Sequence, residues 1–188
     1  MGRVVYRVPW AKEVFLTFDD GPNRDFTPAI LNVLEEYSVP ATFFLMGQNA
    51  KAYPDIVEKI VNQGHSVANH TLSHPDLSLC RIGTIIQEIQ QCRALVPVHY
   101  ILRPPYGNIN VLNMLLVIVL RYKLVFWSID SLDYKKLSYE RIVNNVLQKH
   151  PRNGDVILFH DNNESTVKAL PLIIELLNSK GVERFGKF

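Results

Sequence analysis

Short apolar, β-prone runs alternate with segments of helical periodicity along almost the whole chain, and this alternation restricts the folds open to it. The runs predict strands over residues 14–18, 40–46, 66–69, 99–102, 124–127 and 156–159, with a weaker strand within 182–185. Helical spacing and Gly or Pro stops predict helices over residues 27–37, 53–63, 82–95, 110–122, 138–150 and 166–180. Such alternation is typical of a parallel sheet covered by helices. Residues 1–13 are expected to form an irregular lead-in.

The stretch Thr17-Phe18-Asp19-Asp20-Gly21-Pro22 places two adjacent carboxylates where the first predicted strand ends. A regular strand sends neighbouring side chains to opposite faces, so the backbone must turn there if both carboxylates serve one site. Two adjacent carboxylates repel unless a cation neutralises them, which favours a metal or a basic partner. The alternative is an exposed turn of a kind common in loops.

Polar groups follow the ends of several other predicted strands in the same way. They are Asp19 and Asp20, His70 and His74, Arg103 and Tyr106, Asp130 and Asp133, and His160. In a parallel β/α barrel, functional groups gather on the loops after the strands, whereas an open doubly wound sheet collects them mainly at a switch point. We therefore expect an α/β fold, a distorted or incomplete parallel β/α barrel of six or seven βα units.

Size and composition indicate one soluble globular domain over residues 1–188, because 47% of the residues are apolar and 20% are charged. The formal net charge of +2, with scattered Lys and Arg, argues against a nucleic-acid partner. The longest apolar run, residues 114–120, is too short to insert across a membrane. No signal-peptide pattern is present, although a secreted protein without its leader would look the same.

Cys80 and Cys92 are too far apart along one predicted helix to form a disulfide.

His70 and His74 are four residues apart, in the segment His70-Thr71-Leu72-Ser73-His74-Pro75. Catalytic zinc often takes three protein ligands and leaves one position open for water. One Asp with two His residues is a suitable ligand set. The alternative is an incidental pair of loop histidines.

The segment Arg103-Pro104-Pro105-Tyr106-Gly107 predicts a stiff loop, because its prolines fix φ and have no N–H. Tyr106 carries the first backbone N–H after the prolines, and a rigid, aimed amide suits an oxyanion hole. Arg103 is expected to hold a carboxylate through a bidentate contact. An ordinary proline-rich turn with a surface Arg is the alternative.

His160 follows four apolar residues, so it is either a satisfied core histidine or a proton donor whose pKa Asp133 raises. Trp127 and Tyr134 are candidates for stacking against sugar rings, although Trp127 is equally suited to the core.

Taken in order, the segments TFDDGP, HTLSHP, RPPYG, DSLDY and ILFHD resemble the motifs of the polysaccharide deacetylase family, carbohydrate esterase family four. The resemblance implies a distorted β/α barrel and a divalent metal, usually zinc, with cobalt as an alternative. It implies that Asp20, His70 and His74 bind the metal and that Asp19 is the general base.

The same resemblance implies roles for the remaining residues. Arg103 would hold Asp19 ionised, and the Tyr106 amide would stabilise the oxyanion. His160 would be the general acid, oriented by Asp133. Leu158 would shape the pocket for the acetyl methyl group. The chain departs from the family pattern at two places. Tyr134 replaces the usual tryptophan of the fourth motif. Residues 181–188 stop short of the closing strand usual in the family, which leaves room for an open barrel.

The resulting hypothesis is a metal-dependent hydrolase that removes acetyl groups from N-acetylglucosamine units of a peptidoglycan-like or chitin-like glycan and releases acetate. One alternative is a metal amidase for small non-sugar amides, and another is a non-catalytic carbohydrate-binding relative. The expected partner is an N-acetylated glycan, and the family resemblance favours an extracellular or cell-wall location. The residues leave the oligomeric state open.

Overall fold

The computed structural model describes residues 3–97, 100–182 and 184–188, so residue 99 of the expected strand over 99–102 lies outside the described part. The strands are β1 (Val4–Val5), β2 (Val14–Asp19), β3 (Thr42–Leu45), β4 (Ser66–Asn69), β5 (Ile101–Leu102), β6 (Lys123–Val125), β7 (Ile129–Asp130), β8 (Val156–His160) and β9 (Phe185–Gly186). The helices are α1 (Thr27–Glu36), α2 (Gly47–Ala52), α3 (Pro54–Asn62), α4 (Ile82–Leu95), α5 (Val111–Val119), α6 (Tyr139–Leu147) and α7 (Glu164–Ser179). Short 3₁₀ turns cover Pro105–Gly107 and Asp133–Lys135.

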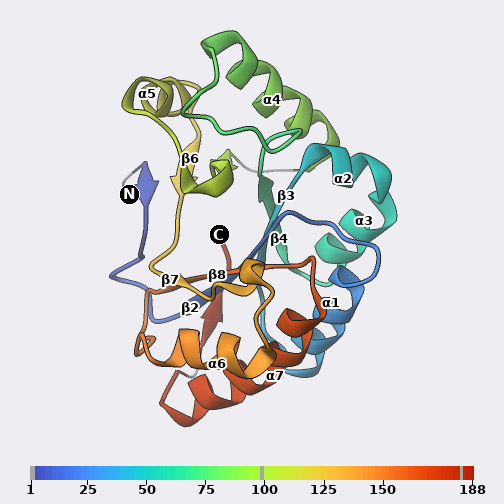
Figure 1. Cartoon of the computed structure of the whole chain (residues 1–188), viewed down its shortest axis with the longest axis vertical. Coiled ribbons are helices and arrows are strands. Elements are labelled where there is room, and N and C mark those ends of the chain that lie inside the picture. Colours follow the sequence, from blue (N-terminus) through green and yellow to red (C-terminus); the bar gives the residue numbers. More distant parts are fainter. Residues whose placement is uncertain (1–2, 98–99, 183) are drawn as a thin grey trace.

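The strands form one curled parallel sheet in the order β1-β6-β5-β4-β3-β2-β8-β7, and β9 adds to β2. The helices lie around the outside of this sheet (Figure 1). Within the described residues, β1 pairs only with β6 and β7 only with β8, so the barrel stays open between them. An antiparallel bridge between Arg7 and Asp155, with an ion pair of 2.9 Å, joins the segment after β1 to the residue before β8. This arrangement confirms the expected incomplete parallel β/α barrel.

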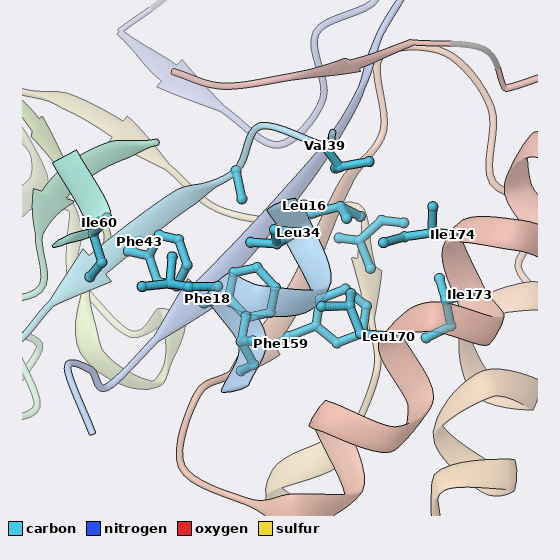
Figure 2. Close-up of a cluster of buried hydrophobic side chains, with 14 of the residues drawn as sticks. Leu16, Phe18, Leu34, Val39, Phe43, Ile60, Phe159, Leu170, Ile173 and Ile174 are labelled. Carbon is cyan, nitrogen blue, oxygen red and sulfur yellow. The ribbon is translucent and has the colours of Figure 1, made fainter. Parts of the chain in front are cut away.

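Alternation along β2 sorts its side chains between two faces. Leu16 and Phe18 point toward the helices, where Phe18 stacks between Phe43 and Phe159 with ring centroids 5.0 and 5.6 Å apart (Figure 2). Thr17 and Asp19 occupy the opposite face, toward the barrel interior. The apolar residues of β2 therefore anchor the strand against α1 and α7, and this register aims Asp19 inward.

Three elements differ from the sequence-based expectation. Residues 1–13 contain β1, which is too short to leave a periodic pattern and forms by pairing with β6. Strand β7 also has only two residues and is held by β8. Helix α2 precedes α3, so the predicted helix over 53–63 is the second half of a helical pair. Tertiary pairing rather than local propensity specifies such short elements.

Of the expected weak strand within 182–185, residue 183 lies outside the described part, and Phe185 belongs to β9, which extends to Gly186. Cys80 and Cys92 are free thiols, as expected, but Cys80 lies just before α4 rather than on it. Among the described residues, no helix combines the length and apolar character needed to cross a bilayer.

Candidate active site

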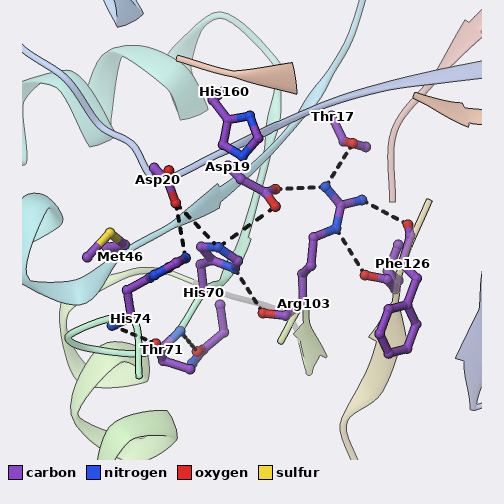
Figure 3. A network of polar contacts seen from close by, with 12 residues as sticks. Thr17, Asp19, Asp20, Met46, His70, Thr71, His74, Arg103, Phe126 and His160 are labelled. Carbon is purple, nitrogen blue, oxygen red and sulfur yellow. Dashed lines mark hydrogen bonds and ion pairs between the residues drawn. The ribbon is translucent and has the colours of Figure 1, made fainter. Parts of the chain in front are cut away.

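The polar groups that follow the strands meet in one cavity of about 290 Å³ at the carboxyl ends of the strands. Its lining consists of Asp19, Asp20, His70, His74, Tyr106, Gly107, Trp127, Asp130, Tyr134, Leu158 and His160. Arg103 and Asp133 lie behind this lining, fully buried, and each contacts a lining residue (Arg103 is seen in Figure 3). Because the strands are parallel, their carboxyl ends share one rim, which is why residues far apart in sequence come together.

Asp20, His70 and His74 form the cluster that suits a metal ion, with ligand atoms all within 4.8 Å of one another. The Oδ1 atom of Asp20 lies 3.5 Å from His70 Nε2 and 3.3 Å from His74 Nε2. This oxygen is buried yet has no hydrogen-bond partner among the described residues. Tetrahedral zinc with ligands at 2.0–2.2 Å would separate them by about 3.4 Å. The residues present therefore fit a divalent metal.

Backbone turns aim the ligands of this cluster. Asp20 has a φ of 75° and His74 a φ of 61°, so both leave the extended path of the chain. The turn expected after Asp19 therefore lies at Asp20 itself. His70 Nδ1 is 2.9 Å from the carbonyl oxygen of Arg103, which can only accept, so Nδ1 carries the proton. This tautomer leaves His70 Nε2 with a free lone pair facing Asp20.

Asp19 is held in the barrel interior by Arg103. Arg103 Nη1 donates to Asp19 Oδ1 at 2.7 Å and to Thr17 Oγ1 at 2.9 Å. Its Nε and Nη2 groups donate to the carbonyls of Val125 and Phe126, each at 3.0 Å. The expected bidentate contact is therefore wrong: the contact is monodentate because two strand-end carbonyls take the other donors. Asp19 Oδ2 consequently remains available toward the cavity, 3.8 Å from His70 Nε2.

His160 and Asp133 form the opposite wall. Asp133 accepts hydrogen bonds from His160 Nδ1, from the His160 backbone N–H and from Thr166 Oγ1, all at 2.7 Å. Burial lowers the pKa of His160, but the bond and charge of Asp133 more than offset this and raise it to about 9. The imidazole is thus cationic at neutral pH and presents Nε2 to the cavity. The structure thus brings Asp133 and His160 into the contact that the family resemblance implies.

Tyr106 and Trp127 form a further wall of the cavity. Tyr106 has a φ of 59°, and its ring packs edge-on against His74 with centroids 4.5 Å apart. Gly107 also has a positive φ, and a Cβ there would lie only 2.6 Å from the Trp127 ring. A side chain at 107 would therefore displace Trp127, so glycine keeps this wall closed. Trp127 lines the cavity and also packs on the core.

A model of the family described as polysaccharide deacetylase matches residues 7–124, more than half of the chain. The chain belongs to the polysaccharide deacetylase family. Named relatives in this family are deacetylases, which places the chain among hydrolases that cleave amide bonds.

The chain is 40% identical over 179 residues to a peptidoglycan-N-acetylglucosamine deacetylase of Bacillus cereus, covering 90% of this chain and 64% of that protein. It is 38% identical over 191 residues to a chitooligosaccharide deacetylase of Rhizobium leguminosarum bv. trifolii, covering 90% and 87%. A solved peptidoglycan N-acetylglucosamine deacetylase superposes with a TM-score of 0.90 at 38% identity, covering 99% of this chain and 91% of that chain. The chain thus spans just under two thirds of the Bacillus cereus protein.

In this polysaccharide deacetylase, Tyr134 stands where the family resemblance leads one to expect tryptophan. Its ring lies edge-on to His160 at 5.6 Å and is half exposed at the mouth of the cavity. Leu158 is almost fully buried and contributes apolar surface to the cavity lining. The replacement keeps an aromatic wall at this position.

Sequence reasoning missed the residues that hold Asp20 and its turn. Asn49 Nδ2 donates to the Asp20 carbonyl at 2.7 Å, and Asn162 Nδ2 donates to Asp20 Oδ2 at 3.3 Å. The buried carboxylate of Asp161 sits where a Cβ on Gly21 would be, and it accepts from Thr27 Oγ1. Asn in a loop is too common to signal such a role. Only Asp161, as the last residue of the ILFHD segment, was within reach of sequence reasoning.

Glu88 of α4 was also missed, although it fastens the loop that carries His70 and His74. Its Oε2 accepts from the backbone N–H groups of Leu72 and Ser73, both at 2.9 Å, and its Oε1 accepts from Ser73 Oγ at 2.7 Å. These bonds fix the loop between the two histidines. A lone Glu on a helix gives no sequence signal for this task.

Glu88→Ala is expected to lower metal affinity by about 10- to 100-fold, because groups that orient metal ligands contribute on that scale. Competitive titration with a chromogenic chelator measures the affinity directly. Gln87→Ala, at an exposed neighbouring position on α4, is the matched control and should retain the wild-type affinity. Equal affinity in wild type and Glu88→Ala would contradict this role.

Proposed function

We propose that this polysaccharide deacetylase removes the acetyl group from N-acetylglucosamine units of a peptidoglycan-like or chitin-like glycan and releases acetate. The observation that carries the proposal is one cavity with an anchored carboxylate, Asp19, on one side and a cationic imidazole, His160, on the other. A base and an acid facing one space are the groups needed to add water to an amide and expel an amine.

We infer that Asp20, His70 and His74 hold a divalent metal, and we favour zinc. Two imidazoles and one carboxylate suit zinc, and the unpartnered Asp20 oxygen supports a cation at this position. When bound, such an ion supplies Lewis-acid chemistry, polarising the acetamide carbonyl and lowering the pKa of water.

Asp19 is assigned as the general base. Its Oδ1 is engaged by Arg103, so its Oδ2 is the atom that takes the proton from the attacking water. The guanidinium is fully buried, and its Nη1 donates to Asp19 Oδ1 at 2.7 Å. Arg103 therefore acts by holding Asp19 in place.

The Tyr106 amide is assigned to the developing oxyanion. Pro104 and Pro105 offer no N–H, and Tyr106 carries the first backbone N–H after them, within the short 3₁₀ turn Pro105–Gly107. A donor aimed before the reaction begins costs no reorganisation as charge develops on the oxygen.

His160 is assigned as the general acid. Its Nδ1–H is held by Asp133, so the proton on Nε2 is the one delivered to the nitrogen of the leaving amino sugar. Loss of this proton leaves a neutral imidazole that Asp133 keeps in the same orientation.

The cavity walls favour a sugar over a small amide. Trp127, Tyr134 and Tyr106 present aromatic surface around the reacting groups, and Tyr106 and Tyr134 are exposed enough to meet rings of an extended glycan. The two relatives named above act on peptidoglycan and on chitooligosaccharides, which share the N-acetylglucosamine unit. A cell-wall glycan lies outside the cytoplasm, and we propose that location for the enzyme.

Acetate release from a panel of substrates tests the proposal. The zinc-loaded protein is expected to release acetate from chitooligosaccharides or N-acetylated peptidoglycan and to leave acetanilide intact. Release from acetanilide alone would instead favour an amidase for small amides. A folded, zinc-loaded protein that releases acetate from none of these substrates would favour the non-catalytic carbohydrate-binding alternative.

A further inference from the structure

Asp130 is a carboxylate in the catalytic cavity that has no task in the mechanism described above. It is the last residue of β7 and lies in register with Leu158 of β8, so the two side chains leave the sheet on the same face. Both line the cavity, where Asp130 stays partly exposed. The pairing of β7 with β8 therefore brings a carboxylate into the cavity in addition to Asp19 and Asp20.

The fold occupies only one oxygen of Asp130. Its Oδ1 accepts from the backbone N–H of Leu132 at 2.8 Å, and this bond supports Leu132 in the left-handed conformation, with a φ of 59°. Its Oδ2 accepts no hydrogen bond from the described part of the chain. The turn thus needs one oxygen of the carboxylate and leaves the other available to a ligand.

The side chains around Asp130 suit a sugar. Burial raises the pKa of the Tyr134 hydroxyl, and the charges of Asp130 and Asp133 add to this, which shows that the Asp130 carboxylate faces Tyr134. Tyr134 is half exposed and lies edge-on to His160. An aromatic ring can cover the C–H groups of a sugar while a carboxylate beside it accepts from the hydroxyls. Asp130 and Tyr134 together offer both kinds of contact next to the proton donor.

We propose that Asp130 Oδ2 accepts a hydrogen bond from a hydroxyl of the N-acetylglucosamine unit in the cavity and so recognises the sugar to which the acetamide is attached. This inference rests on the proposed function, because it takes that unit as the substrate. In a 1,4-linked glycan the linkages occupy C1 and C4, and C2 carries the acetamide. The hydroxyl that Asp130 receives is therefore the one on C3 or the one on C6.

This contact would select sugars against simple acetamides. Burial raises the pKa of Asp130, because the cavity wall shields the carboxylate from water. A hydroxyl that donates to Oδ2 replaces the water that is displaced when the substrate enters. An amide without hydroxyls would displace the same water and leave Oδ2 without a donor, which is costly at a partly buried carboxylate.

Asp130→Asn tests the contact without removing the turn, because the Asn oxygen can still accept from Leu132 N–H while its NH₂ group cannot accept from a hydroxyl. The KM for chitotriose is expected to rise by about 10- to 100-fold, the scale of a hydrogen bond to a charged group. The kcat should stay near that of the wild type, because the bond forms equally in the ground state and the transition state. Asp25→Asn, at an exposed position, is the matched control and should keep the wild-type KM.

An unchanged KM in Asp130→Asn would overturn the proposal. So would a fall in kcat at constant KM, because that result would mean that Asp130 serves only the loop that carries Asp133.

Deoxygenated substrates identify the hydroxyl. Chitotriose without the C3 hydroxyls and chitotriose without the C6 hydroxyls are compared with chitotriose itself. For one of the two analogues, the wild type should lose more than Asp130→Asn does, by about the factor that the substitution itself costs, because both changes remove the same bond. Equal losses in the two proteins for each analogue would mean that Asp130 receives no hydroxyl.

The proposed function and the role of Asp130 can fail separately. If the zinc-loaded wild type released no acetate, calorimetric titration of chitotriose into the same protein would replace the kinetic measurements. Weaker binding by Asp130→Asn than by Asp25→Asn would then support the role of Asp130, and only the deacetylase activity would be ruled out. Equal binding by the two variants, or no binding by the wild type, would overturn the role of Asp130.

Discussion

Asp19→Asn is expected to lower the turnover of acetate release by about 10²- to 10⁴-fold while zinc content stays near that of the wild type. The size of the loss is that of removing a general base, because an amide cannot accept the proton from water at neutral pH. Arg103 can still donate to the Asn oxygen at position 19, so the fold and the metal ligands are retained. Turnover and zinc per protein chain, measured on the same dialysed sample, check both halves of this expectation.

The neighbouring change should differ in kind. Asp20→Asn removes the carboxylate that faces both His70 and His74, and an amide oxygen is a poor ligand for zinc. Zinc should then be lost on dialysis, and excess zinc should restore part of the turnover. Dialysis of the wild type against a strong chelator should have the same effect, with recovery on adding zinc or cobalt.

Asp25→Asn, an exposed position in the loop before α1, is the control for both changes and should match the wild type. The assignment would be reversed if Asp19→Asn emptied the site while Asp20→Asn kept its zinc. Equal loss of zinc in both variants would mean that the two carboxylates clamp the metal together and that the base lies elsewhere.

His160→Ala is expected to reduce turnover by about 10²- to 10⁴-fold, because the leaving amine would depart without a proton donor. Zinc content should not change, since His160 is outside the Asp20, His70 and His74 cluster. The exposed His150→Ala serves as the matched control. Near-normal turnover of His160→Ala at saturating substrate would contradict its role as the acid.

The pH profile separates the orienting role of Asp133 from a purely structural one. A general acid must be protonated, so activity is present below the pKa of His160 and is lost as pH rises through it. Asp133 raises that pKa, against burial, to about 9. In Asp133→Asn the raising charge is gone, and the alkaline limb of turnover should move to lower pH. An Asp133→Asn profile that overlays the wild type would rule out the pairing.

The strand ends were predictable because their signals are local. The run before Asp19 and the run before His160 are apolar and β-prone, and breakers follow Asp20 directly. In a parallel sheet such ends must share a rim, so the alternation of strands and helices was enough to bring these groups to one site. The open barrel was also expected, because the sequence predicts only six or seven strands, which favours an incomplete barrel.

The partners of Arg103 were not predictable. Its donors reach Thr17 on β2 and the carbonyls of Val125 and Phe126 at the end of β6, which are remote in sequence. Their convergence depends on how the sheet curls, and no pattern in the chain encodes a free carbonyl. The expectation of a bidentate contact with Asp19 was wrong because these carbonyls take the other donors of Arg103.

The sequence by itself therefore determined the fold class, the family motifs and the identity of the groups in the cavity. The tertiary structure decided which atoms of these groups are engaged and which are left for chemistry. Glu88 and Asn49, each carried by a different helix, gain their roles only where the helices meet the loops of the site. The short strand β1 likewise exists only because β6 pairs with it. Hydrogen bonds over such separations depend on three-dimensional packing, whereas periodicity and turn chemistry act over a few residues.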